Sequence, residues 1–240
     1  MTASLTTTVG EITSQYPQTI RVFQRLGVEF CCDGRLTLAE LCRERNLPFA
    51  DLASALTKAI AAPVPPRQDW NTRPLGELAD HISEAFHEPL HSELPELRRM
   101  AARVERHRDS STHGHIGVQS ELERFNSDLV RHVATTERAL FPLIRRIEAG
   151  TADERDRQPF DRLRSTLEAD HVEARHTLQV LRAATDRYEP PVHACATLRG
   201  LYRGLKELEQ LMQLHVHLEN NVLFPRAAAL LANARIVRPS

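Results

Sequence analysis

A histidine-containing segment that occurs twice most constrains how this chain can fold. Residues 215–225 read His-Val-His-Leu-Glu-Asn-Asn-Val-Leu-Phe-Pro, and residues 132–142 read His-Val-Ala-Thr-Thr-Glu-Arg-Ala-Leu-Phe-Pro. Glu219 follows His215 by four residues, and on an α-helix such a pair lies on one face with Cβ atoms about 5–6 Å apart. An imidazole and a carboxylate in this arrangement can bind iron, manganese or zinc. The repeat therefore predicts a metal held inside a helical bundle.

Both segments end in Leu-Phe-Pro. Leucine and phenylalanine fill cores, and a proline within a helix removes one hydrogen bond and bends the axis. We interpret the two triplets as packing and kink elements rather than as part of the chemistry.

The composition favours an all-α protein. Hydrophobic residues make up 41% of the 240 residues and charged residues 26%, which is ordinary for a chain with a packed core. Only nine glycines, 5% aromatic residues and abundant Ala, Leu, Glu and Arg favour helix over sheet. No alternating strand pattern bounded by hairpin turns is found.

Charge and hydropathy exclude some partners. The formal net charge of -1 gives no reason to expect a nucleic acid or an anionic membrane as partner. No apolar run approaches the roughly 20 residues that a transmembrane helix needs. The N-terminus has neither a basic start nor an apolar stretch, unlike a signal peptide. We therefore expect a cytoplasmic protein with reduced thiols and no membrane contact.

The proline-rich run 62–69 separates two helical regions. Before it we expect three short helices, one from Pro17 to Gly27, one capped by Thr37, and one from Pro48 to about Ala61. After it we expect four longer helices near 74–107, 116–149, 159–187 and 194–231. Short breaks at 109–114, 150–153 and 188–191 make these neighbours antiparallel, as in an up-down four-helix bundle. The predicted domains are a small helical domain over 1–62, a linker over 63–73, and the bundle over 74–240.

Each long helix places one histidine at a similar depth. Each pair of consecutive central histidines lies on either side of one break, and each histidine is about 20–25 residues from that break. Because a helix rises about 1.5 Å per residue, antiparallel neighbours would bring these histidines to roughly the same level. The four are His87, His132, His171 and His215. A lone core histidine bonded to a neighbour would be the ordinary interpretation of any one of them, but four at one level favour metal ligands. His176 and His217 lie off the shared faces and are expected at the surface.

Cys31 and Cys32 are adjacent, in Phe-Cys-Cys-Asp-Gly. Neighbouring cysteines can hardly close a relaxed disulfide across a planar trans peptide. The pair could bind a soft metal, exchange electrons, or be two small buried residues. Cys42 and Cys195 are isolated and are expected in the core.

These features together resemble the RIC family (repair of iron centres, also called ScdA-type). The resemblance extends from about Val9 to Ala229. It rests on the cysteine pair, the four histidines and the run from His215 to Arg226. It implies a cytoplasmic protein that restores iron–sulfur clusters damaged by nitric oxide or oxidants, with a non-haem di-iron centre in a hemerythrin-like bundle. By position it makes the four histidines iron ligands, Glu219 a bridging carboxylate, and Cys31 and Cys32 the thiol or redox pair.

One position departs from the family pattern. The family's second bridging glutamate would fall four residues after His132, where this chain has Thr136. Glu137 is next to it, but it would need a local helical bulge to reach the metal. Asp128, four residues before His132, lies on the right face. We expect the second iron to bind less tightly than the first unless Asp128 or Glu137 fills the gap.

Three functions stay open at this stage. The resemblance favours a stress-response protein that repairs clusters or supplies iron to them, with damaged iron–sulfur proteins as partners. The alternatives are a hemerythrin-like sensor that binds O₂ or NO, and a non-haem iron enzyme that reduces NO. The residues do not decide whether the protein is an enzyme or whether it forms a homodimer.

Overall fold

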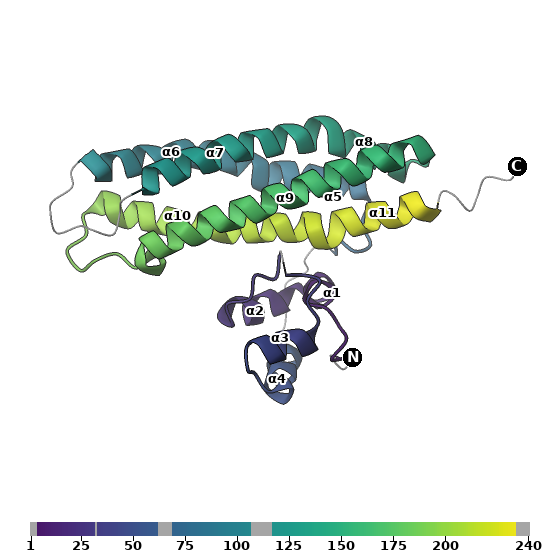
Figure 1. Cartoon of the computed structure of the whole chain (residues 1–240), viewed down its shortest axis with the longest axis horizontal. Coiled ribbons are helices and arrows are strands. Elements are labelled where there is room, and N and C mark those ends of the chain that lie inside the picture. The colour runs from purple at the N-terminus through teal and green to yellow at the C-terminus, as the bar shows by residue number, and fades with distance from the viewer. Residues whose placement is uncertain (1–3, 32, 62–68, 107–116, 234–240) are drawn as a thin grey trace, which may run out of the picture. The chain divides into compact units, whose positions relative to one another are not determined.

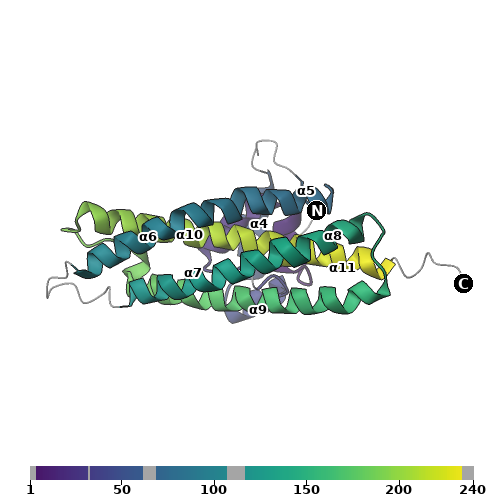
Figure 2. The ribbon, with the colours of Figure 1, turned by 90° about the horizontal axis from the view of Figure 1, so that it is seen from above.

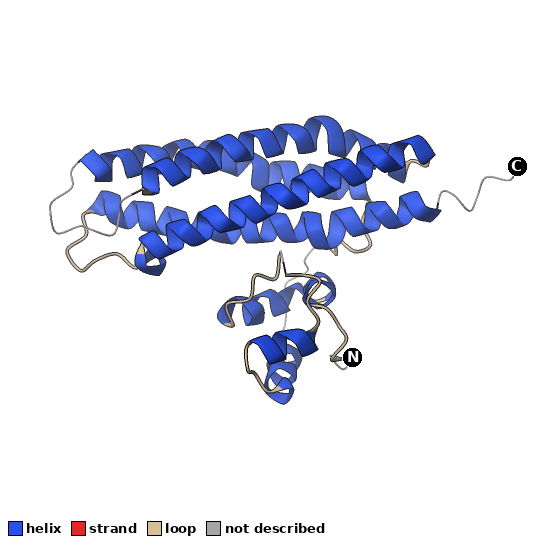
Figure 3. Ribbon diagram, in the orientation of Figure 1, coloured by secondary structure: helices blue, strands red, loops and turns tan. Residues whose placement is uncertain are grey.

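The computed structural model describes residues 4–31, 33–61, 69–106 and 117–233. Within these ranges the chain is helical with connecting turns and contains no strand, which confirms the all-α prediction (Figure 3). The chain divides into two compact units. One consists of Ala79–Met212, and the other combines Met1–Leu78 with Gln213–Ser240. Among the described residues, no helix combines the length and apolar character needed to cross a membrane.

The Ala79–Met212 unit is a bundle of long antiparallel helical runs. The first run contains α5 (Leu75–Ile82), η2 (Ser83–His87) and α6 (Glu88–Arg106), and the second contains α7 (Val118–Thr135), η4 (Thr136–Leu140) and α8 (Phe141–Glu148). They are followed by α9 (Glu154–Ala184) and α10 (Ala196–Leu218). Both views show α6, α7, α9 and α10 running side by side (Figure 1 and Figure 2). The expected up-down bundle is therefore confirmed.

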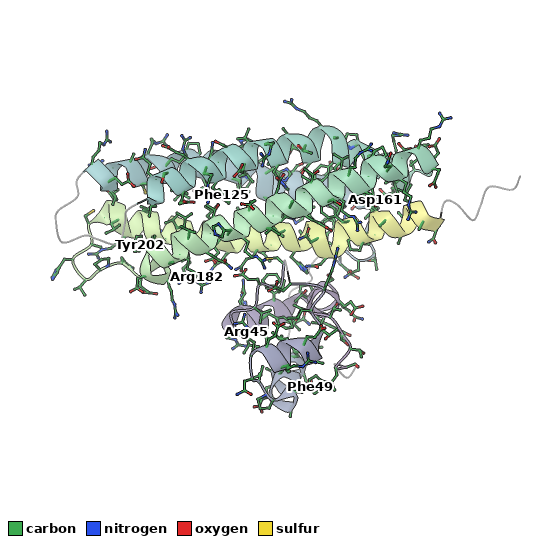
Figure 4. The ribbon with its side chains drawn as sticks, viewed as in Figure 1. Arg45, Phe49, Phe125, Asp161, Arg182 and Tyr202 are labelled. Atoms are coloured by element: carbon green, nitrogen blue, oxygen red, sulfur yellow. The ribbon has the colours of Figure 1, made fainter. Side chains whose placement is uncertain are left out.

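Apolar residues at helical spacing hold this bundle together. Phe125 of α7 and Tyr202 of α10 are both buried (Figure 4). Gly204 of α10 lies so close to Leu97 of α6 that a methyl group there would overlap the leucine side chain. At the edge, Arg182 of α9 forms an ion pair with Glu209 of α10 at 3.3 Å. The core thus forms because each helix turns its apolar stripe inward.

Helix boundaries differ modestly from the sequence-based expectation. α9 begins at Glu154 instead of 159, because Asp153 caps it and exchanges hydrogen bonds with Asp156 in a capping box. The turn before it follows the prediction, and Gly150 has a φ of 67°, which glycine adopts at little cost. The expected break at 109–114 lies outside the described residues. Cys195 is exposed, so its predicted place in the core was wrong, and Cys42 is half-buried.

Three of the helical runs contain one wide, π-helical turn. These turns are η2, η4 and η6 (Glu219–Leu223). A proline stands two residues after each of them, and the three are Pro89, Pro142 and Pro225. A proline has no N–H to donate and its ring crowds the carbonyl four residues back, so a wider turn relieves the crowding. The expected kink at Leu-Phe-Pro is therefore a π-helical turn just before the Phe-Pro pair.

The other unit contains α1 (Val9–Gln15), η1 (Pro17–Thr19), α2 (Ile20–Arg25), α3 (Leu38–Glu44) and α4 (Phe49–Ala61), with η6 and α11 (Phe224–Asn233). Thr37 caps α3 as predicted, and α4 ends at Ala61 as expected. α1 was not predicted. Thr8 starts it with a capping box shared with Glu11, and the Gly10 N–H donates to the Gly34 carbonyl at 2.8 Å. Residues 62–68 of the proposed linker lie outside the described residues, and the domain boundaries stay a prediction.

Candidate metal centre

His215 and Glu219 face one another as their spacing predicted. His215 is near the end of α10, and Glu219 opens η6 one turn later. The Nε2 atom of His215 lies 3.5 Å from Oε1 of Glu219, and both side chains are fully buried. Because burying a carboxylate is costly without compensating charge, this pair is a natural site for a cation.

Three further buried histidines gather in the Ala79–Met212 unit. The His132 ring centroid lies 6.4 Å from that of His87 and 4.9 Å from that of His171. The three side chains are 1–3% exposed. His87 also stacks on Phe141, with the ring planes 6° apart. These three imidazoles, which come from η2, α7 and α9, therefore lie close together, as expected from their similar depth in the predicted helices.

Four of the predicted ligands form one cluster. A single ligand atom from each of His87, His132, His215 and Glu219 can be chosen so that all lie within 4.8 Å of one another. His171 is not part of this group, but it packs on His132. Imidazole nitrogens with a buried carboxylate form a donor set that suits iron, and equally zinc or manganese. The residues therefore fit a metal ion.

Thr136, which replaces the family's second glutamate, is fully buried. Its hydroxyl donates to the His132 carbonyl at 2.9 Å. The bulge that Glu137 needed does exist, since both residues lie in η4. The Glu137 carboxylate, however, lies 2.8 Å from Nδ1 of His87 and accepts a hydrogen bond from Ser83. Asp128 instead forms an ion pair with Arg131 at 3.2 Å.

Asp170, which precedes His171, was not predicted as a site residue. Its Oδ2 lies 3.7 Å from Nδ1 of His132, and its other oxygen pairs with Arg131 at 3.1 Å. Burial raises the pKa of Asp170, but the contact with His132 and the charge of Arg131 outweigh it and lower the pKa overall. With Asp128, it lines a small pocket on one side of His132 and His171. In the sequence, only the position of Asp170 next to His171 indicated that it lies near the site.

Cys31 is buried, while Cys32 lies outside the described residues. The amide nitrogen of Asn221 lies 3.3 Å from the carbonyl oxygens of Phe30 and Cys31, and 3.1 Å from Nδ1 of His217. His217 is also buried and contacts Phe30 edge-on, so its expected exposure was wrong. Burial lowers the pKa of His217 to about 4. The segment before the cysteine pair thus packs directly on the residues around Glu219.

Comparison with known proteins is consistent with this architecture. The ScdA N-terminal domain, described as a domain of unknown function, matches residues 5–60, and the hemerythrin HHE cation-binding domain matches residues 78–227. The iron–sulfur cluster repair protein YtfE of Musicola paradisiaca is 37% identical over 91% of this chain and 95% of its own length. The chain belongs to the YtfE family. YtfE proteins of Edwardsiella ictaluri and Escherichia coli are 36% and 32% identical, again over 91% and 92% of this chain and 95% and 96% of theirs. The predicted resemblance is therefore confirmed over nearly the whole chain.

Proposed function

We propose that this protein binds non-haem iron in its helical bundle and takes part in the repair of iron–sulfur clusters damaged by nitric oxide or oxidants. The observation that supports it most directly is the buried cluster of His87, His132, His215 and Glu219. The family relation supports the second half, because the relatives are named iron–sulfur cluster repair proteins. The partners would be damaged iron–sulfur proteins, with O₂ or NO as small ligands.

The candidate ligands offer two kinds of donor atom for iron. His87, His132, His171 and His215 would supply nitrogen donors, and Glu219 would bridge as the buried carboxylate. Bound iron with open coordination positions supplies a place for a small ligand such as O₂ or NO. With Thr136 where a glutamate would stand, two irons would share one fewer negative charge and one fewer bridge. We therefore expect a tight first iron and a weaker second one.

A weakly held iron suits donation better than permanent storage. The charge of a ferric ion in a buried site needs anionic donors to offset the loss of hydration. A site short of one carboxylate releases iron more readily to an acceptor protein. The Cys31 and Cys32 thiols would act as the first acceptor of iron or electrons, since a thiolate is a strong iron ligand.

Transfer of labelled iron tests this function. The full chain is loaded with an iron isotope and mixed, without oxygen, with an iron–sulfur enzyme inactivated by nitric oxide. We expect the enzyme to regain activity and the label to appear in its cluster, faster than with the same amount of free iron. Reversible NO binding without transfer would favour a sensor instead, and NO consumption with a reductant would favour an NO-reducing enzyme.

A further inference from the structure

The carboxylate of Glu137 connects two of the wide helical turns. Ser83 and His87 are the first and last residues of η2, and Glu137 is the second residue of η4. Oε1 of Glu137 accepts a hydrogen bond from the Ser83 hydroxyl at 3.1 Å and lies 2.8 Å from Nδ1 of His87. The wide turn in η4 therefore turns this side chain toward η2.

The bond to Glu137 fixes how His87 can act. An ionised carboxylate only accepts hydrogen bonds, so Nδ1 of His87 carries the proton and donates it. Nε2 then carries no proton, so it is the ring nitrogen whose lone pair could bind a metal. The ring is further held by stacking on Phe141, with centroids 6.0 Å apart. His87 is 1% exposed, so the ring has little freedom to turn.

The same bond directs the Glu137 carboxylate to a different nitrogen of His87 from the one that would bind a metal. The carboxylate lies at the Nδ1 edge of the imidazole, and a metal bound to Nε2 would lie at the opposite edge. The carboxylate also stays 41% exposed, whereas the clustered ligands are buried. Asp170 lies at the corresponding Nδ1 atom of His132, but at 3.7 Å it is too far for a hydrogen bond.

We propose that Glu137 is a positioning residue, which orients His87 for metal binding and returns, through the imidazole, part of the negative charge that Thr136 does not provide. The proposal rests on the proposed metal site. A carboxylate bonded to a ligand histidine makes the imidazole a stronger donor and fixes its tautomer. Because Glu137 would act through His87 and would not bind the metal itself, we still expect the second metal to bind less tightly than the first.

Metal titration of the full chain tests the role, with Co²⁺ as a spectroscopic probe and Fe²⁺ under anaerobic conditions. Loss of such an outer partner weakens metal binding by about 10–100-fold. We expect a loss of this size for Glu137→Ala and a smaller loss for Glu137→Gln, whose amide oxygen can still accept from Nδ1. Arg138→Ala, at the next and exposed residue of η4, is the matched control and should bind like the parent protein. Circular dichroism checks that all variants are equally helical.

A double-mutant cycle with His87 separates positioning from general packing. If Glu137 acts through His87, Glu137→Ala has no further effect on affinity in a His87→Ala background. In the Co²⁺-loaded protein, the Nδ1 proton of His87 should give a resonance that is protected from solvent exchange. The resonance should persist in Glu137→Gln and broaden in Glu137→Ala.

The outcomes are distinguishable. Unchanged affinity in Glu137→Ala, or an equal loss with and without His87, would overturn the positioning role while the metal site stands. A drop of one whole metal per chain in both Glu137 variants would make Glu137 a direct ligand and would overturn it as well. A parent protein that binds no metal would overturn the proposed function and this inference together.

Discussion

Replacing Thr136 by glutamate would restore the carboxylate that the family pattern places there. Thr136 is fully buried, and its hydroxyl donates to the His132 carbonyl of its own helix at 2.9 Å. Losing that hydrogen bond costs about 1 kcal/mol. Burying a carboxylate without a cation costs several kcal/mol more, unless the group takes up a proton. We therefore expect metal-free Thr136→Glu to be less stable than the parent by on the order of 3 kcal/mol.

Metal should reverse this effect, because it offsets the buried charge. A ligand present at about 100 times its dissociation constant stabilises the folded state by about 2.7 kcal/mol. If the new carboxylate ligates the second iron, Thr136→Glu gains more stability from iron than the parent does and keeps more iron per chain during titration with a chelator. Urea unfolding of metal-free and iron-loaded protein measures the first quantity, and metal analysis measures the second.

Thr135 offers a matched control. Its hydroxyl makes the same kind of bond to its own helix, donating to the Arg131 carbonyl at 2.9 Å, but the residue is partly exposed. Thr135→Glu should change stability by no more than about 0.5 kcal/mol and leave iron retention unaltered. Equal loss of iron from Thr136→Glu and the parent protein under the chelator would show that the missing carboxylate is not what limits binding of the second iron.

Two further changes test the packing around the cysteine segment. Asn221→Ala removes the donor to the Phe30 and Cys31 carbonyls, so we expect the free energy of unfolding to fall by about 1–3 kcal/mol. Alkylation of Cys31, located by mass spectrometry, should become faster, and an unchanged rate would contradict the contact. Gly10→Ala should destabilise the protein by about 1–3 kcal/mol, although alanine favours helix. The new Cβ would lie 2.9 Å from the Gly34 carbonyl oxygen and 2.8 Å from Asn221 Oδ1. A variant that is more stable in thermal unfolding would show that helix propensity outweighs the overlap.

Periodicity and spacing were sufficient to predict the bundle and the gathering of its histidines. A regular rise per residue places His87, His132 and His171 at one depth whatever the details of side-chain packing. Each of these residues is buried in the structure, as is His215. The sequence showed only that Glu137 would need a bulge to reach the metal. It predicted neither that the bulge exists nor where the carboxylate points, because its partner is Nδ1 of His87 on another helix.

Tertiary contacts explain the features that were missed. On a helical wheel, His217 lies about 200° from His215 and looks exposed. In the structure Phe30 and Asn221 cover it, and Phe30 is distant in sequence. α1 was missed because Val-Gly-Glu-Ile-Thr is a poor helix former, and its packing against the Gly34 segment overrides that propensity. The prolines that follow each π-helical turn were visible, but a proline alone does not distinguish a wide turn from a simple kink.

Whether the four central histidines bind iron is tested by the iron content of the purified full chain and of the single alanine variants at these positions. Each protein is reconstituted with Fe²⁺ without oxygen, passed through a desalting column and analysed for iron per chain, and circular dichroism confirms its helicity. We expect the parent to keep iron, and each of the variants His87→Ala, His132→Ala, His171→Ala and His215→Ala to keep clearly less at nearly the same helicity. Full iron retention in any two of these variants would contradict the assignment of the site.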